Sequence, residues 1–230
     1  MSRVLTLFDL DGTLVELWDV HVKVYESMFI EVYGLHGIDF RKKYAPGGTS
    51  ESTVNDVLTY LGYRRDFIDA NIRQVMPALE RLYVPAIKKG KVNVLPGIEE
   101  LLNALQERGI PKGVVTGNRQ SATDLILRKA GLDNFFLFTA TADNSEDREE
   151  RLRMAIAKAE YMQSCKYQRG YIYFFDDSYA SIPVSRKLGI KSVAVASDEI
   201  PYERLFAAEP DYLFRNLTNI EEILKILLQK

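Results

Sequence analysis

Cysteine and histidine are scarce in this chain of 230 residues, and their scarcity excludes disulfides and several kinds of metal site. Because Cys165 is the only cysteine, the chain holds no intramolecular disulfide and no cysteine-based metal cluster. His21 and His36 are too few for a histidine-rich zinc or iron centre. Oxygen ligands are plentiful, since aspartate and glutamate together number 32, so a hard cation such as magnesium remains open.

The chain also lacks an excess of either charge and any long apolar run. Its 30 basic and 32 acidic residues leave a formal charge of −2, with no basic stripe for nucleic acid and no polybasic membrane anchor. Charged residues interrupt every apolar segment, and the first residues do not resemble a signal peptide. We therefore expect a cytoplasmic protein with neither nucleic acid nor membrane as partner; the oligomeric state is not indicated.

Short apolar runs alternate with amphipathic stretches over the later part of the chain. Four runs, at 4–8, 112–115, 171–175 and 192–196, have the length and composition of buried strands. The expected helices cover 98–107, 121–130, 151–161 and 220–228. Such alternation requires crossover connections, so we predict an α/β fold with a doubly wound, mainly parallel sheet.

One part of the chain breaks this alternation. Between about residues 14 and 92 the apolar residues recur at helical spacing, and no strand is evident. Trp18, Tyr25 and Phe29 share such a spacing, which we interpret as a core stripe rather than a ligand-binding box. The prediction is an α/β core of residues 1–14 and 93–230, with a helical domain of residues 15–92 inserted after the first strand.

Two aspartates stand where the first predicted strand ends. Asp9 and Asp11 lie two residues apart, so on an extended segment their side chains face the same way, and Gly12 permits a sharp turn after them. Ligands bind beyond the carboxyl ends of strands in open α/β sheets. Two close carboxylates require a cation or a shared proton, which suits a metal-assisted nucleophile beside a general acid. An acidic turn is the simpler interpretation, whereas a calcium EF-hand does not fit the glycine position.

The whole string Phe-Asp-Leu-Asp-Gly-Thr-Leu at residues 8–14 is much more specific than two acids. It resembles the first motif of the haloacid dehalogenase superfamily. The resemblance continues through residues 95–105, 115–118 and 130–136 and looks like the phosphoglycolate-phosphatase-like branch. It implies that Asp9 is the nucleophile, that Asp11 is the general acid and base, and that the second aspartate favours phosphoryl chemistry over dehalogenation.

A hydroxyl residue follows the strand predicted at 112–115. Thr116 precedes a helix expected near Asn118, and a hydroxyl with free N–H groups at a helix start suits a phosphate. A simple helix cap by Thr116 or Asn118 is the commoner role for such residues. The family resemblance favours phosphate binding by Thr116 and by the backbone N–H of Gly117.

The third motif departs from the family pattern, because no lysine stands where relatives carry one. The charged segment 143–151 resembles a sub-branch in which an Asp-Arg pair opens the helix and alanines follow. In that register Arg148 aligns as the cation that binds the phosphoryl group. A solvated helix face is an almost equal alternative, with Arg151 and Lys158 as the next candidates for the cation.

The fourth motif is an apolar strand that ends in two adjacent acids, Asp176 and Asp177. Neighbouring residues on a strand face opposite ways, so only one of them is expected to bind a metal directly. Counting back from Gly189 favours Asp177 and places Ser181 where relatives carry a further acid, whereas the strand end favours Asp176. The resemblance implies Mg²⁺ held at Asp9, Asp11 and these two acids.

The predicted helical domain contains a glycine-rich segment at residues 46–50, ahead of a helix. It is either an ordinary turn with Thr49 or Ser50 as the cap, or a loop of a cap domain that faces the active site.

These observations lead to a magnesium-dependent phosphatase that hydrolyses a small phosphorylated metabolite through an aspartyl-phosphate. The inserted domain is expected to cap the site and to select small substrates. Two alternatives stay open: a phosphomutase that uses the same residues on a sugar phosphate, and a binding module without catalytic activity on the same fold.

Overall fold

The computed structural model of the chain describes residues 4–43, 50–197 and 200–228. The chain divides into two compact units, residues 1–16 with 92–230 and residues 17–91. The first unit exceeds the predicted core by a few residues because β2 (Val15–Glu16) pairs with β3 (Asn93–Val94) in a small antiparallel sheet.

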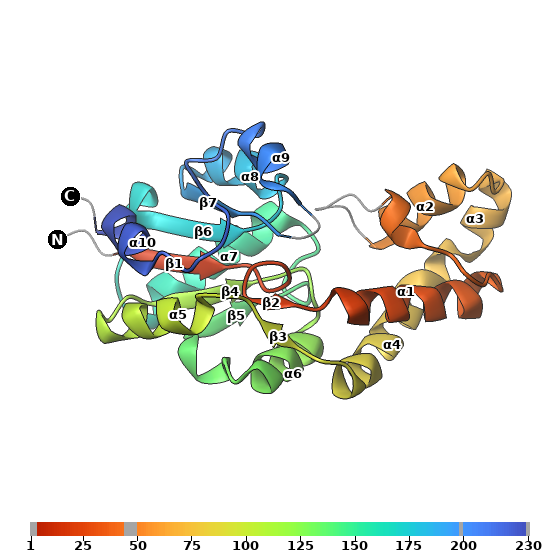
Figure 1. The fold of residues 1–230 in the computed structure, drawn as a ribbon, viewed down its shortest axis with the longest axis horizontal. Coiled ribbons are helices and arrows are strands. Elements are labelled where there is room, and N and C mark those ends of the chain that lie inside the picture. Colours follow the sequence, from red (N-terminus) through yellow and green to blue (C-terminus); the bar gives the residue numbers. More distant parts are fainter. Residues whose placement is uncertain (1–3, 44–49, 198–199, 229–230) are drawn as a thin grey trace. The chain divides into compact units, whose positions relative to one another are not determined.

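Six parallel strands form the sheet of the first unit, in the order β5-β4-β1-β6-β7-β8 (Figure 1). The doubly wound fold class predicted from the alternating pattern is therefore confirmed. The strands are β1 (Leu5–Phe8), β4 (Lys112–Val115), β5 (Phe138–Ala140), β6 (Ile172–Asp176), β7 (Lys191–Val195) and β8 (Tyr212–Phe214).

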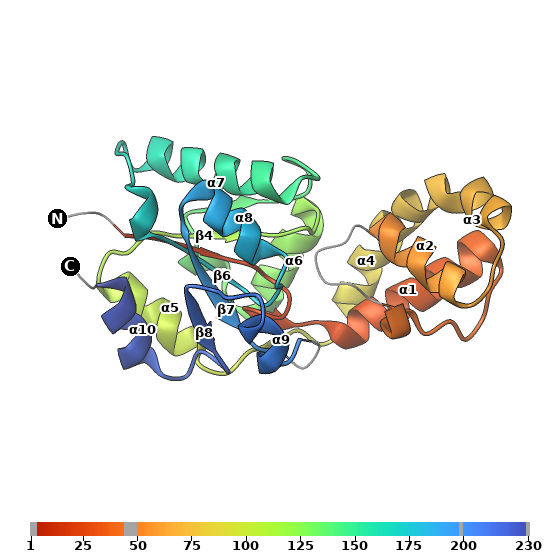
Figure 2. The ribbon, with the colours of Figure 1, turned by 90° about the horizontal axis from the view of Figure 1, so that it is seen from above.

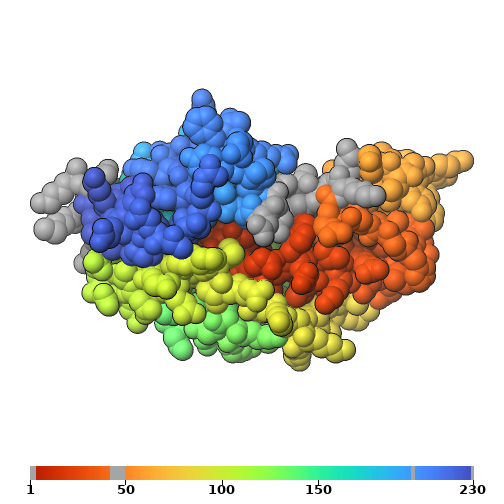
Figure 3. Space-filling view, viewed as in Figure 1, coloured from red at the N-terminus to blue at the C-terminus, as the bar shows by residue number. Residues whose placement is uncertain are grey.

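Helices cover both faces of this sheet. Figure 2 shows α7 and α8 on one face, with α5 and α10 on the other. The helices of this unit are α5 (Ile98–Glu107), α6 (Gln120–Ala130), α7 (Arg148–Met162), α8 (Ser181–Leu188), α9 (Tyr202–Phe206) and α10 (Ile220–Leu227), with short 3-10 turns at Asp133–Phe135 and Arg169–Tyr171. In Figure 3, α5 and α10 lie side by side although they are far apart in the sequence, as their contacts confirm.

A hydrophobic core of this unit lies between the sheet and α7. Leu7, Val115 and Phe174 from three strands meet Ala155 and Ala159, which are completely buried on the helix. Two alanines on the buried face allow the helix axis to approach the sheet closely. The same face continues toward the helix start, so it determines where Arg148 and Arg151 point.

The second unit is helical, as predicted for this part of the chain. Its helices are α1 (Trp18–Tyr33), α2 (Ser50–Tyr60), α3 (Arg65–Asn71) and α4 (Val75–Lys89), with short 3-10 turns at Phe40–Lys43 and Ile72–Gln74. Helix α1 packs along α4, and Tyr25 stacks on Phe40 with ring centroids 4.3 Å apart. Tyr25 and Phe29 are buried, as a core stripe requires, whereas Trp18 is only half-buried. Among the described residues, no helix combines the length and apolar character needed to cross a membrane.

Candidate active site

Asp9 and Asp176 lie at the same edge of the sheet, at the ends of the neighbouring strands β1 and β6. Phe8 of β1 pairs with Phe175 of β6, and the N–H of Asp9 donates to the Phe175 carbonyl at 2.8 Å. Asp9 and Asp176 therefore follow at the next position of each strand. Because both strands run the same way, the two carboxylates emerge together at the carboxyl edge.

Asp177 completes a group of three acids. One carboxylate oxygen each from Asp9, Asp176 and Asp177 lie within 4.8 Å of one another. The expected opposite orientation of Asp176 and Asp177 is wrong, because β6 ends at Asp176 and the alternation of a strand does not extend to Asp177. Three converging carboxylates are the donor set that a hard cation such as Mg²⁺ prefers, so these residues fit the metal that the sequence predicts.

The turn after β1 is shaped around Asp177. Gly12 has φ +74°, and a Cβ at this position would lie 2.1 Å from Asp177 Oδ2. Only glycine allows Asp177 to approach the backbone so closely, which explains why Gly12 stands between Asp11 and Thr13. The Ser197 hydroxyl donates to the same Asp177 oxygen at 2.9 Å. Ser197 was not anticipated, since nothing near it in the sequence indicates a site.

Asp11 has a different environment from the three acids. The Asn118 side-chain amide donates a short hydrogen bond to Asp11 Oδ2, so the loop after β4 contacts the turn after β1. Asp11 does not belong to the group of converging carboxylates found among the described residues, although the sequence placed it with the metal ligands. The amide fixes the orientation of the Asp11 carboxyl beside that group.

Thr116 is 3% exposed and lies at the end of β4. Its hydroxyl oxygen accepts the Asn118 N–H at 3.2 Å, which leaves the hydroxyl proton able to donate. The helix expected near Asn118 starts later, at Gln120, and the Asp143 carboxylate accepts the Gln120 N–H at 2.7 Å. Thr116 and Gly117 therefore belong to a loop rather than to a helix start, and neither caps α6.

Arg148 reaches the acids from the first turn of α7. Its Nη1 donates to Asp176 Oδ2 at 2.8 Å, while the Asp176 side chain is only 2% exposed. Arg148 therefore does not belong to a solvated helix face, which was the alternative to its role as the cation of the site. Burial raises the pKa of Asp176, and the Arg148 guanidinium opposes that increase.

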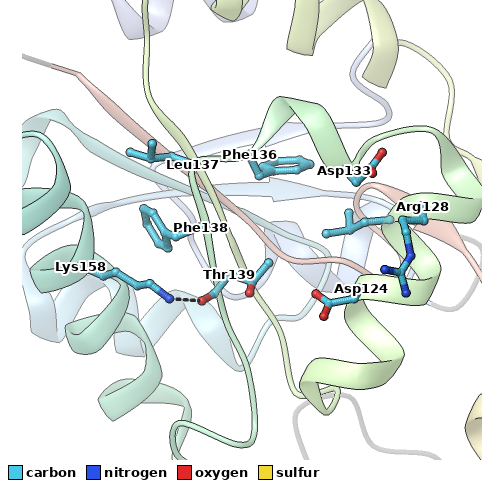
Figure 4. Close-up of a pocket in the computed structure, with 9 residues that line it drawn as sticks. Asp124, Arg128, Asp133, Phe136, Leu137, Phe138, Thr139 and Lys158 are labelled. Carbon is cyan, nitrogen blue, oxygen red and sulfur yellow. Dashed lines mark hydrogen bonds between the residues drawn. The ribbon is translucent and has the colours of Figure 1, made fainter.

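The two alternative cations, Arg151 and Lys158, lie in different places. Arg151 is 6% exposed, and its Nη2 lies near Gly117 in the loop after β4. Lys158 lies elsewhere: its Nζ donates to the Thr139 carbonyl at 3.2 Å, as Figure 4 shows. Lys158 lines a pocket of about 330 Å³ between α6, β5 and α7, whose lining includes none of Asp9, Asp11, Asp176 and Asp177. The structure therefore excludes Lys158 from the group around the acids.

Most of the glycine-rich segment of residues 46–50 lies outside the described residues. Residues 46–49 fall outside the described part of the chain, and Ser50 is the first residue of α2.

The crowded acids predict a specific pH dependence of stability. Burial raises the pKa of Asp9 well above its usual range, the Asp176 charge adds to the increase, and Arg148 opposes it. A carboxyl whose pKa is raised by folding contributes stability below its unfolded pKa of about 3.9, and loses it as the pH rises. In metal-free buffer, Asp9→Asn should therefore gain stability relative to the unmodified protein between about pH 4 and pH 7.

Urea unfolding of both proteins at a series of pH values measures this difference. Carboxyls remote from Asp9 contribute equally to both curves, so the difference between the curves reports on Asp9 together with the acids that its charge affects. Added Mg²⁺ should favour the unmodified protein, which keeps all three converging carboxylates. A difference that does not change with pH would contradict the expected state of Asp9.

A family model and curated relatives match most of the chain. The family model described as haloacid dehalogenase-like hydrolase matches residues 6–195, which span the first strand to the end of β7. Pyrophosphatase PpaX of Bacillus velezensis is 25% identical over 94% of this chain and 94% of its own length.

Solved structures show the same fold. The structure of a predicted phosphoglycolate phosphatase from Haemophilus somnus has a TM-score of 0.76 at 20% identity, covering 97% of this chain and 99% of its own. A β-phosphoglucomutase from Clostridium difficile also has a TM-score of 0.76 at 20% identity, covering 98% and 97%. The first-strand motif, the parallel sheet and the match over most of the chain together establish that this protein belongs to the haloacid dehalogenase-like hydrolase family.

Proposed function

We propose that this enzyme is a magnesium-dependent phosphatase that hydrolyses a small phosphorylated metabolite through an aspartyl-phosphate on Asp9. The observation that carries the proposal is the convergence of Asp9, Asp176 and Asp177, with Arg148 bonded to the same group. A nucleophilic carboxylate, oxygen ligands for a cation and a fixed positive charge are the components that phosphoryl transfer needs.

In the first step, an Asp9 carboxylate oxygen forms a bond to phosphorus while the bond from phosphorus to the leaving oxygen breaks. Asp11 donates its proton to that leaving oxygen, which departs as an alcohol. The amide of Asn118, bonded to Asp11 Oδ2, holds the Asp11 carboxyl in position for this transfer. The product of this step is a phosphoryl group on Asp9.

In the second step, a water oxygen attacks phosphorus and Asp11 accepts the proton from that water. The bond between phosphorus and Asp9 breaks, which regenerates the Asp9 carboxylate and releases inorganic phosphate. Arg148 and the Thr116 hydroxyl, with the N–H of Gly117, donate to the phosphoryl oxygens during both steps. Their positions are set by folded elements, so little reorganisation is needed during the reaction.

Asp9, Asp176 and Asp177 would hold the cation, and Ser197 orients Asp177 through its hydroxyl. When bound, Mg²⁺ neutralises charge at the crowded carboxylates and on the phosphoryl group. The chain provides Arg148 as a permanent second positive charge at Asp176. Charge neutralisation is needed because like charges otherwise favour protonated, non-nucleophilic carboxyls.

Release of inorganic phosphate from small substrates tests the proposal. The panel begins with pyrophosphate and phosphoglycolate, which the names of relatives suggest, and adds sugar phosphates. Hydrolysis with Mg²⁺ and without a bisphosphate cofactor is expected for at least one member. Phosphoryl transfer between sugar positions that requires a bisphosphate, without net phosphate release, would instead identify a phosphomutase.

Arg148→Ala should lower kcat/KM by roughly a hundredfold, because it removes about 2–4 kcal/mol of transition-state stabilisation. Arg153→Ala is the matched control, since Arg153 lies on the same helix and pairs with Glu149 on the surface. An exposed ion pair contributes little, so this variant should stay near the activity of the unmodified enzyme. Equal activity of the two variants on one substrate would remove Arg148 from the mechanism.

A further inference from the structure

A second arginine of α7 is buried in the same region, and the mechanism above does not use it. Arg151 is 6% exposed and follows Arg148 by three residues, so both side chains lie on one face of the helix. Full burial of an arginine is rare unless an anion or several acceptors accompany it. Its surroundings therefore indicate what it does.

The hydrogen bonds of Arg151 satisfy only part of its guanidinium. Nη1 donates to the carbonyls of Ser145 at 2.8 Å and Glu146 at 2.9 Å. Nε is buried and finds no hydrogen-bond partner in the described part of the chain. None of the ion pairs formed by the described residues includes Arg151. The side chain is thus anchored at one nitrogen, while its charge has no carboxylate bonded to it.

This arrangement brings two positive charges close together, and of the two arginines only Arg148 forms an ion pair with a carboxylate among the described residues. Arg148 and Arg151 stand in the first turns of α7, where the helix dipole is already positive. Like charges three residues apart on one helix face also repel each other. Burial, and then the Arg148 charge, lower the pKa of Arg151, whereas the Asp9 charge opposes this effect. An anion bound between the arginines and the loop after β4 would offset the repulsion.

The free side of the guanidinium faces that loop. A Cβ built at Gly117 would lie 3.8 Å from Arg151 Nη2, the nearest atom to that position. Gly117 directly follows Thr116, the residue expected to donate to phosphate. Arg148, in contrast, is bonded to Asp176 on the side of the acids. The two arginines therefore approach the same region from different sides.

We infer that Arg151 is a second phosphate-binding cation, which holds the substrate phosphate from the side of Gly117 while Arg148 holds it from the side of Asp176. This inference rests on the proposed phosphatase function and extends it. The bonds to Ser145 and Glu146 fix Nη1, so that Nη2, on the side of Gly117, remains for a phosphate oxygen. A planar fork of donors suits a phosphate better than the single ammonium of lysine does.

Binding of inorganic phosphate, measured by calorimetry in the presence of Mg²⁺, tests the inference directly. Arg151→Met keeps much of the side-chain volume but removes the charge, and its dissociation constant should rise roughly tenfold to a hundredfold. Arg151→Lys retains the charge without the fork and should bind with intermediate affinity. Arg153→Met is the control on the exposed face of α7 and should bind phosphate like the unmodified protein.

Unchanged phosphate affinity in folded Arg151→Met would overturn the inference. If Arg151 only stabilises the loop through its hydrogen bonds to Ser145 and Glu146, Arg151→Met should keep its phosphate affinity and have a lower melting temperature. If Arg151→Met does not fold, Arg151→Lys decides, because an affinity equal to that of the unmodified protein refutes the fork. The proposed function is judged separately, by phosphate release: a protein that binds phosphate through Arg151 yet hydrolyses no substrate would refute the function and not the inference.

Discussion

Asp9→Asn is expected to reduce phosphate release to background while the protein stays folded. Asparagine has nearly the shape of aspartate, but its amide cannot attack phosphorus as an anionic nucleophile. Loss of a nucleophile that forms a covalent intermediate lowers kcat by roughly a thousandfold or more. Asp176 and Asp177 are not expected to replace it, because Asp176 is bonded to Arg148 and Asp177 to Ser197.

The measurement combines phosphate release with a denaturation curve for each protein. Asp133→Asn is the matched control, since it makes the same chemical change at an exposed residue. Asp133 lines the pocket between α6, β5 and α7, away from Asp9. This control should retain full activity. A folded Asp9→Asn protein with near-normal activity would show that the reaction begins elsewhere, and direct attack by water would then need consideration.

The fold was largely predictable because its longer elements have strong patterns. The strand at Lys112–Val115 and the helix at Ile98–Glu107 have the predicted bounds. The strands β5 (Phe138–Ala140) and β8 (Tyr212–Phe214) were missed, since three residues are too few to show a period. Both lie at the edges of the sheet, where the pairing partner rather than local sequence defines a strand.

The site was less predictable than the fold, because its geometry depends on contacts between distant segments. Asp9 and Asp176 followed from strand ends, whereas the turn of Asp177 toward them depends on where β6 stops. The Asn118 contact with Asp11 joins residues 107 positions apart. Burial of Arg151 could have been suspected from its spacing to Arg148 and the later alanines. The charged residues at the start of α7 do not by themselves show which face of this helix is buried.

Removal of magnesium is expected to abolish activity, and calcium is expected to restore little of it. Without a cation, Asp9 faces the charges of Asp176, Asp177 and Asp11, and its raised pKa favours the protonated form. An Asp9 carboxyl surrounded by uncompensated negative charges is a poor nucleophile toward an anionic phosphate, so the metal-free protein should release phosphate at background rate.

Calcium has the same charge as magnesium, so a comparison of the two ions separates neutralisation from geometry. Magnesium holds oxygen ligands at about 2.0–2.1 Å in octahedral geometry, whereas calcium takes more ligands at about 2.3–2.6 Å. A displacement of this size between nucleophile and phosphorus is enough to slow a reaction that depends on alignment. Calcium should therefore bind and stabilise the folded protein, yet support little turnover.

Activity and melting temperature of exhaustively chelated protein, with each ion then added back, measure both effects. The two arginines make this test informative, since they already provide two positive charges beside the acids without any metal. If these charges were sufficient, chelated enzyme would keep its full rate, and the metal would have no place in the reaction. If neutralisation alone mattered, calcium and magnesium would serve equally well. Restoration by magnesium, together with stabilisation but little activity from calcium, would show that the converging carboxylates require both the charge and the shorter ligand distances.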